Sequence, residues 1–229
     1  MREKIEVSVI LPCRNEESAV AACVKEARAF LVQLGVEGEI LVVDNASEDA
    51  SARIAKESGA RVIRQPLPGY GRALRAGIRA GRGEYLLMAD CDTTYELKEL
   101  EKLYHKLKDD GCDMVIGDRF AGGIEPGAMP FSHKLGAEVL SALGRRRFHC
   151  EVKDFHCGIR GLSREAAKRL KLRTAGMEFA TEMIALASAA GMRIGQVPVQ
   201  LKKARFPRMS KLRTLRDGFR HLRYILVYK

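Results

Sequence analysis

Short apolar runs alternate with longer amphipathic segments through the first half of the chain. The apolar runs cover residues 5–12, 38–45, 60–65, 84–90 and 112–120, and helical spacing favours helices over 16–34, 48–58 and 96–109 and within the segment PGYGRALRAGIRAGRG. Strands that alternate with helices predict a mostly parallel sheet with helices on both faces. Continuous apolar runs such as ILVV fit strands that are covered on both sides. We therefore expect an α/β, Rossmann-like fold.

The alternation becomes less regular after Phe120. A Gly/Pro-rich loop, AGGIEPGAMP, precedes an expected helix over 131–144, a strand and turn in KDFHCGIRGLS, two helices in REAAKRL and EFATEMIALASAA, and a last strand in MRIGQVPVQL. From about Ser210 a helix is expected, because apolar residues recur at helical spacing. These residues are Leu212, Leu215, Phe219, Leu222 and Leu226.

Positive charge is concentrated at the end of the chain. The net charge is +11 over 229 residues, and the segment 200–229 has ten Lys or Arg against one acid, which leaves about +2 for the first 199 residues. A basic amphipathic segment indicates an anionic partner such as a membrane surface, a phosphate-rich ligand or nucleic acid. No apolar run approaches the ~20 residues of a membrane-spanning helix. We expect peripheral rather than integral membrane contact.

The six cysteines form no CxxC pair, and no secretory signal precedes them. We interpret them as reduced thiols of a cytoplasmic protein. The segment HCEVKDFHC contains two His and two Cys, but its spacing fits no common zinc pattern. Incidental loop and strand thiols are the favoured interpretation.

Polar residues follow several predicted strands at their carboxyl ends, where open parallel sheets bind their ligands. They are Pro12, Arg14, Asn15 and Glu16 after the first strand, Asp44, Asn45, Ser47 and Asp49 after the second, Asp90 and Asp92 after the fourth, and Asp118 and Arg119 after the fifth. Any one of these turns could be a simple helix cap. Their convergence on one edge indicates a binding site.

Asp90 and Asp92 are separated only by Cys91 at the end of a buried strand. Two neighbouring carboxylates repel each other, and burying either without a partner is costly. A hard divalent cation such as Mg²⁺ or Mn²⁺ prefers carboxylate oxygens and often bridges to ligand phosphates. The pair therefore predicts a metal site next to a phosphate group.

The chain resembles family-2 glycosyltransferases of the GT-A fold and, within them, the polyprenyl-phosphate (dolichyl-phosphate) mannose/glucose synthases. The matching segments run in family order to about residue 200: VSVILPCRNEE, EILVVDNASEDAS, GYGRALRAGI, YLLMADCDTTY, VIGDRF, DFHCGIRGLSREA and GMEFATEM. The resemblance implies a glycosyltransferase domain over 1–209, with a nucleotide-sugar half over 1–120 and an acceptor half over 121–209. A basic amphipathic tail over 210–229 would follow it.

The resemblance also implies roles for single residues. A GDP- or UDP-linked hexose would be held by Pro12, Arg14, Glu16, Asp44, Asn45, Gly71, Arg72, Asp90 and Cys91. Asp90 and Asp92 would hold Mg²⁺ or Mn²⁺, and Arg119 would complete the catalytic group by contacting phosphate. The chain departs from the family pattern where Thr94 stands in place of a frequent Gln, and where Asn45 replaces the second acid of the VDDGS turn.

The acceptor class depends on whether the reaction needs a base. A hydroxyl acceptor needs one, and Glu182 and Asp154 are the candidates, although Glu182 could instead serve helix packing and Asp154 could orient an arginine. A phosphate monoester, with a second pKa of about 6, is already a nucleophilic dianion and needs only cations. The candidate cations are Arg119, Arg160, Lys202, Lys203, Arg205, Arg208 and Lys211.

We therefore predict inverting transfer of a hexose to a polyprenyl phosphate, on the cytoplasmic face of an anionic membrane. A hydroxyl acceptor is the alternative. A nucleic-acid-binding protein is a more distant one, because the basic tail has no aromatic stacking platform or recognisable nucleic-acid motif beside it.

Overall fold

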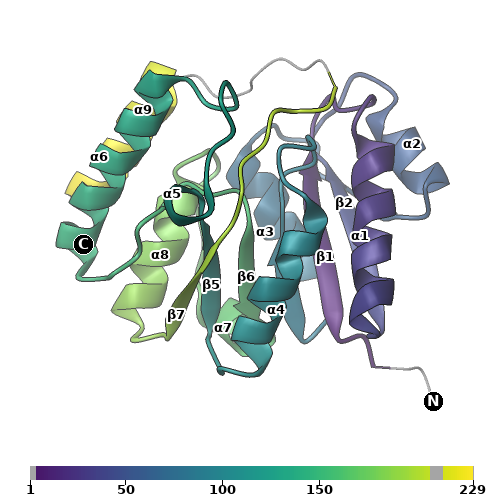
Figure 1. Cartoon of the computed structure of the whole chain (residues 1–229), viewed down its shortest axis with the longest axis horizontal. Helices are drawn as coiled ribbons and strands as arrows, with labels where there is room; N and C mark the ends of the chain where they lie inside the picture. Colours follow the sequence, from purple (N-terminus) through teal and green to yellow (C-terminus); the bar gives the residue numbers. More distant parts are fainter. Residues whose placement is uncertain (1–3, 207–213, 229) are drawn as a thin grey trace.

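The computed structural model describes residues 4–206 and 214–228 and builds one seven-stranded sheet (Figure 1). Its strands follow the order β3-β2-β1-β4-β6-β5-β7. They span β1 Val7–Cys13, β2 Gly38–Asp44, β3 Arg61–Arg64, β4 Tyr85–Met88, β5 Met114–Asp118, β6 Arg160–Ser163 and β7 Ile194–Pro198. β6 runs antiparallel to β4 and β5, and the other pairs in this sheet are parallel. The predicted mostly parallel α/β fold is confirmed.

Helices cover both faces of this sheet. They span α1 Val20–Leu34, α2 Ser51–Glu57, α3 Tyr70–Ala80, α4 Leu100–Lys108 after the short 3₁₀ helix η1 Leu97–Glu99, α5 Arg119–Gly122, α6 Phe131–Phe148, α7 Arg164–Arg169, α8 Phe179–Ala189 and α9 Thr214–Val227. α1 and α4 pack together on one face, and α3 and α8 pack together on the other (Figure 1). α6 and α9 lie side by side at one end of the molecule.

Some element boundaries differ from the prediction for local reasons. The helix expected from Glu16 begins at Val20, because Asn15 adopts a left-handed conformation (φ 51°) and a turn precedes the helix. The helix expected over 131–144 continues through three arginines to Phe148 and ends where His149 turns left-handed (φ 52°). The fifth strand ends at Asp118, whose side chain accepts hydrogen bonds from two backbone N–H groups of α5 and caps that short helix.

The core lies between the sheet and its helices. Side chains of β1 and β4, including Val9, Leu11 and Leu87, are fully buried. α3 approaches the sheet closely because Gly77 carries no side chain, and a Cβ there would lie 2.3 Å from Cγ2 of Ile10. This tight packing fixes the first turn of α3 next to the carboxyl ends of the central strands.

The carboxyl edge of the sheet contains strained backbone. Asn15, Ala46 and Thr93 follow β1, β2 and β4, and each has a φ between 51° and 61°. The left-handed conformation costs Ala46 and Thr93 roughly 1–2 kcal/mol each, whereas asparagine adopts it more readily. Strain of this kind concentrates at ligand-binding sites. It marks the edge that the sequence pattern predicts.

α9 packs back on the domain through a face that the sequence pattern did not single out. Asp217, His221 and Ile225 are buried, at a spacing of four residues. Of the predicted apolar stripe, Leu222 is half-buried, and the exposed members are Leu215, Phe219 and Leu226. The start of the predicted tail, with Leu212 and Lys211, lies outside the described residues. In the described part of the chain, no helix has the length and apolarity to cross a membrane.

Candidate functional site

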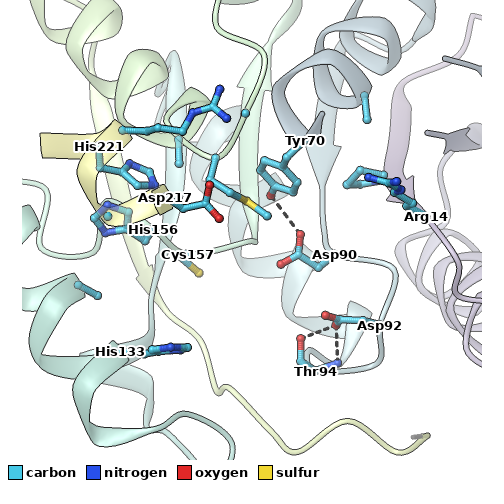
Figure 2. A pocket seen from close by; sticks show the side chains of 18 of the residues that line it. Arg14, Tyr70, Asp90, Asp92, Thr94, His133, His156, Cys157, Asp217 and His221 are labelled. Carbon is cyan, nitrogen blue, oxygen red and sulfur yellow. Dashed lines mark hydrogen bonds between the residues drawn. The ribbon is translucent and has the colours of Figure 1, made fainter. Parts of the chain in front are cut away.

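A cavity of about 760 Å³ opens at the carboxyl edge of the sheet. The ends of β1, β2 and β4 contribute Pro12, Arg14, Asn45, Asp90 and Asp92 to its wall. α6, α8 and α9 close the other side (Figure 2). The sheet topology therefore brings together polar residues, from Arg14 to Asp92, that lie far apart in the sequence.

Asp90 and Asp92 lie on the loop that follows β4, and each accepts hydrogen bonds. The Tyr70 hydroxyl donates to Oδ1 of Asp90 over 3.0 Å. The backbone N–H and the hydroxyl of Thr94 donate to Oδ1 of Asp92 over 3.0 and 2.5 Å (Figure 2). Burial and then the charge of Asp90 raise the pKa of Tyr70 well above its ordinary value, so the phenol stays a donor. Thr94, which stands where the family pattern often has Gln, thus orients Asp92.

Asn45, the other departure from the family pattern, holds the loop that leads into α3. Its Nδ2 donates to the carbonyl of Leu67 over 2.9 Å, and its Oδ1 accepts from the N–H of Gly69 over 2.8 Å. A carboxylate could accept from Gly69 but could not donate to Leu67. The amide therefore suits this position better than the acid, and it also lines the cavity.

Arg119 reaches the cavity from the first position of α5 and is 7 % exposed. Its Nε and Nη2 donate to the two carboxylate oxygens of Asp154 over 2.6 and 2.8 Å. Asp154 is fully buried and also accepts from the backbone N–H of His156. The bidentate geometry fixes the guanidinium at the cavity wall. This geometry matches the arginine-orienting role that the sequence left open for Asp154, and Asp154 itself does not line the cavity.

Most of the predicted donor residues meet at this cavity. Its lining includes Pro12, Arg14, Glu16, Asn45, Arg72, Asp90, Cys91 and Asp92. Two predicted residues are set back from it. Asp44 accepts from the N–H of Ser47 and supports the turn after β2. Gly71 packs against the 174–176 loop, where a Cβ would lie 2.6 Å from the carbonyl oxygen of Thr174.

Arg160 and Glu182 lie outside the cavity lining and serve internal hydrogen bonds. Arg160 is 1 % exposed and donates to the carbonyls of Phe155, Cys157 and Ala180. Burial lowers its pKa. The sequence assigned Arg160 to the acceptor, but its donors are used to join the 155–157 loop to α8.

Glu182 has a corresponding internal role in α8. Its carboxylate accepts from the N–H of Arg173 and from the N–H and hydroxyl of Thr174, over 2.9, 3.0 and 2.6 Å. These bonds anchor the loop against which α3 packs. This geometry matches the helix-packing role. Glu182 does not line the cavity, where a base would have to act.

Two of the predicted acceptor cations after β7 are directed to neighbouring acids. Lys202 pairs with Glu96, and Arg205 pairs with Glu26. Glu96 lies on the loop that also holds Asp92, and its pKa is lowered to about 2 by hydrogen bonds from Lys202 and Lys98. Neither Lys202 nor Arg205 lines the cavity, and Arg208 and Lys211 lie outside the described residues.

Several cavity residues had no assigned role in the sequence reasoning. His156, Asp217 and His221 stand on the side of the cavity opposite Arg14 (Figure 2). The ring centroids of His156 and His221 are 4.4 Å apart, edge to face, and Nδ1 of His221 meets the hydroxyl of Thr181 at 2.8 Å. Burial lowers the pKa of His221 to about 4 and that of His156 well below its ordinary value. Of these three residues, only Asp217 stood out in the sequence, because it is the single acid of a basic helix.

The chemistry of the site suits a hard cation at the carboxylate pair. Asp90 and Asp92 supply oxygen donors on the cavity wall, and such donors are those that Mg²⁺ and Mn²⁺ prefer. Among the described residues, no group of three or more His, Cys, Asp or Glu forms a self-sufficient metal site. A hard cation with only two protein carboxylates completes its shell with substrate phosphate and water. Among the described residues, the His and Cys side chains of the HCEVKDFHC segment do not gather into a group of three potential metal ligands, and its two cysteines form no disulfide.

The comparisons with known proteins agree with this geometry. The model of glycosyl transferase family 2 matches residues 8–171. The chain is 37 % identical over 224 residues to the low-salt glycan biosynthesis hexosyltransferase Agl6 of Haloferax volcanii, covering 96 % of this chain and 53 % of that protein. It is 29 % identical over 198 residues to a dolichyl-phosphate hexose transferase of the same organism, covering 86 % and 83 %. The chain thus spans about half the length of the first of these relatives.

The fold also matches solved structures. Glucosyl-3-phosphoglycerate synthase of Mycobacterium tuberculosis, in complex with Mn²⁺ and uridine-diphosphate-glucose, superimposes with a TM-score of 0.73 at 24 % identity, over 97 % of this chain and 78 % of that one. At this identity the match establishes the GT-A fold.

Proposed function

The chain belongs to glycosyl transferase family 2, and we propose that it transfers a hexose, with inversion, from a GDP- or UDP-linked donor to a polyprenyl phosphate at the cytoplasmic face of a membrane. One observation carries the choice of acceptor. Arg119 stands at the cavity wall, while Asp154 and Glu182, the two bases considered for a hydroxyl acceptor, are engaged in internal hydrogen bonds. An acceptor that needs a cation and no base fits this arrangement best.

The donor lies along the β1–β2–β4 edge in this proposal. Arg14, Glu16 and Asn45 line the part of the cavity where the nucleoside would bind. Asp90 and Asp92 would hold Mg²⁺ or Mn²⁺, which when bound supplies positive charge to the diphosphate leaving group. Tyr70 and Thr94 orient these carboxylates by the hydrogen bonds described above.

Arg119 receives the acceptor phosphate in this proposal. Its bonds to Asp154 use Nε and Nη2, and among the described residues no hydrogen-bond partner is found for Nη1. A phosphate oxygen of the dianion attacks C1 of the hexose, the bond from C1 to the diphosphate oxygen breaks, and the electron pair leaves with the nucleoside diphosphate. No proton has to move, because the nucleophilic oxygen carries none at neutral pH.

A hydroxyl acceptor is the second candidate, favoured by one observation. Asp217 is a buried carboxylate on the cavity wall, and it could take a proton from a hydroxyl. The solved neighbour in complex with phosphoglyceric acid shows that this fold also accommodates such acceptors. If the acceptor is a hydroxyl, Asp217→Asn abolishes transfer. If the acceptor is a lipid phosphate, the same variant leaves transfer largely intact.

The test is a screen of nucleotide sugars for nucleoside diphosphate release with a short polyprenyl phosphate or 3-phosphoglycerate, with Mn²⁺ or with chelator. We expect transfer to the polyprenyl phosphate, its loss in chelator, and loss of Mn²⁺-dependent donor binding in Asp92→Asn with an unchanged far-UV spectrum. Full activity in chelator would refute the metal. Transfer to phosphoglycerate alone would refute the lipid acceptor.

A further inference from the structure

α6 exposes a row of large apolar side chains along its length. Phe131, Leu135, Val139 and Leu143 recur every four residues and are 40 to 77 % exposed. A spacing of four residues places them along one side of the helix. The residues that α6 buries, Ser141, Gly144 and Phe148, project on the opposite side. The exposed row is therefore a second apolar face that the domain itself does not cover.

α9 has the same arrangement. Leu215, Phe219, Leu226 and Val227 are 65 to 89 % exposed, although the helix is anchored to the domain by its buried Asp217–His221–Ile225 side. α9 lies beside α6 (Figure 1). Tyr228, the residue after α9, joins the two helices: Nη2 of Arg147 donates to its carbonyl over 2.5 Å, and its ring meets that of Phe148 edge to face.

These eight residues of α6 and α9 form what we call the docking surface. The described residues expose ten large apolar side chains in all, and eight of them belong to it. The remaining two, Val32 and Leu67, lie apart on α1 and on the loop before α3. Scattered apolar residues are ordinary on a protein surface, but a concentration of this kind marks an interaction site.

Positive charge accompanies the docking surface. The helices α6 and α9 contain seven Lys or Arg and two carboxylates, of which Asp217 is buried and Glu138 is exposed. Lys134, Arg146 and Arg223 are exposed beside the apolar rows. At the end of α6 a hollow is lined by Arg145, Arg146, His149, Cys150 and Glu151. The partner of this surface therefore has an apolar part and a negatively charged part.

The helices that carry the docking surface also form a wall of the catalytic cavity. Ser132, His133 and Ala137 of α6 and Arg216 and Arg220 of α9 line it. Whatever binds the docking surface thus lies against helices that form part of the cavity wall.

We propose that the docking surface binds an anionic lipid bilayer, with α6 and α9 lying side by side at the level of the headgroups. Apolar side chains would enter the acyl boundary while Lys and Arg meet lipid phosphates, as in amphipathic helices that lie in a membrane interface. A second copy of the chain fits this surface poorly. A two-fold interface would place the basic residues of one copy against those of the other, and juxtaposed like charges oppose association.

The purpose of this contact rests on the proposed function, because a polyprenyl phosphate is embedded in the bilayer. Docking through α6 and α9 presents the cavity to the phosphate end of such an acceptor. α6 is the essential new element here, since a basic tail alone could bind the membrane without orienting the cavity.

The test is flotation of the purified chain with phosphatidylcholine vesicles that contain or lack phosphatidylglycerol, at low salt and at about 1 M salt. The variant Leu135→Glu/Val139→Glu alters α6, and Leu215→Glu/Phe219→Glu alters α9. Val32→Glu is the matched control, because Val32 is 76 % exposed on a helix remote from this surface. We expect each double variant to lose at least about tenfold of the vesicle-bound fraction, and the control to bind like the wild type. High salt and the absence of phosphatidylglycerol should weaken binding of the wild type.

A second measurement separates this inference from the proposed function. Transfer to a short, water-soluble polyprenyl phosphate without vesicles should be equal in the wild type and the α6 variant, because Leu135 and Val139 do not line the cavity. If transfer is absent in all proteins while vesicle binding follows the expected pattern, the proposed function fails and the docking surface stands. The docking surface is overturned if the α6 variant floats like Val32→Glu. It is also overturned if the wild type ignores anionic vesicles, or if sedimentation shows a wild-type dimer that the α6 variant converts to monomer.

Discussion

Asp154→Asn removes the negative charge that faces Arg119 while preserving the shape of the side chain. Asp154 is fully buried, and both of its oxygens accept from the guanidinium, over 2.6 and 2.8 Å. The neutral amide leaves a buried arginine without its counter-charge, and its NH₂ group faces guanidinium donors. Breaking a buried pair in this way costs about 3–5 kcal/mol. For a domain of this size we therefore expect the melting temperature to fall by roughly 6–20 °C.

Thermal unfolding followed by far-UV circular dichroism measures this change, and transfer is assayed well below the melting temperature of the variant. Replacing both partners, as Arg119→Met with Asp154→Leu, removes the uncompensated charge and should recover most of the stability. Transfer should nevertheless be lost in this double variant, because it lacks Arg119, the proposed phosphate-binding cation. Recovery of stability without recovery of activity would separate the two roles of the pair.

Two results would refute this reasoning. A melting temperature of Asp154→Asn within about 2 °C of the wild type would mean that the pair contributes little. A variant that is fully stable, transfers normally to polyprenyl phosphate and is at least about 10²-fold slower with a hydroxyl acceptor would instead return Asp154 to the role of a general base. Arg119→Ala should likewise lower both stability and rate, because the arginine is buried in the pair and is not a surface residue.

Two further predictions concern buried titratable groups. Because burial lowers the pKa of His221 to about 4, the unfolded chain takes up a proton below about pH 6.5 that the folded chain does not, and the free energy of unfolding should fall by up to about 1.4 kcal/mol per pH unit between pH ~6.5 and ~4. The free energy of unfolding, measured by urea titration at several pH values in this range, should depend less steeply on pH in His221→Gln. An unchanged pH dependence would contradict the assignment. Glu182→Gln should destabilise the chain by about 1–3 kcal/mol through its lost bond to the 173–174 backbone and leave kcat within a few-fold. A loss of about 10²-fold or more in kcat at intact stability would identify Glu182 as a base.

The sequence by itself determined the sheet, the family resemblance and the edge where the site lies. Strand and helix periodicities are local properties of the chain, and in a parallel sheet the carboxyl ends of the strands meet at one edge. Asp90, Asp92, Arg14 and Arg119 could therefore be placed around one cavity without coordinates, and the structure places all four on its wall.

Only the tertiary structure decided which charged residues face that cavity. Arg119 and Asp154 are 35 positions apart, and Arg160 reaches a carbonyl 20 positions away. Such partners satisfy buried charges, and no local pattern specifies them. The sequence therefore could not tell Arg160 from a cation available to a ligand.

The same limit applies to α9. Its apolar spacing identified the stripe that contains Leu215 and Phe219, but the domain packs on the polar side that contains Asp217 and His221. That side can be buried because tertiary partners such as Thr181 satisfy its polar atoms. Periodicity reports where apolar side chains lie on a helix, whereas the choice of the buried side depends on the hydrogen-bond partners that the rest of the fold supplies.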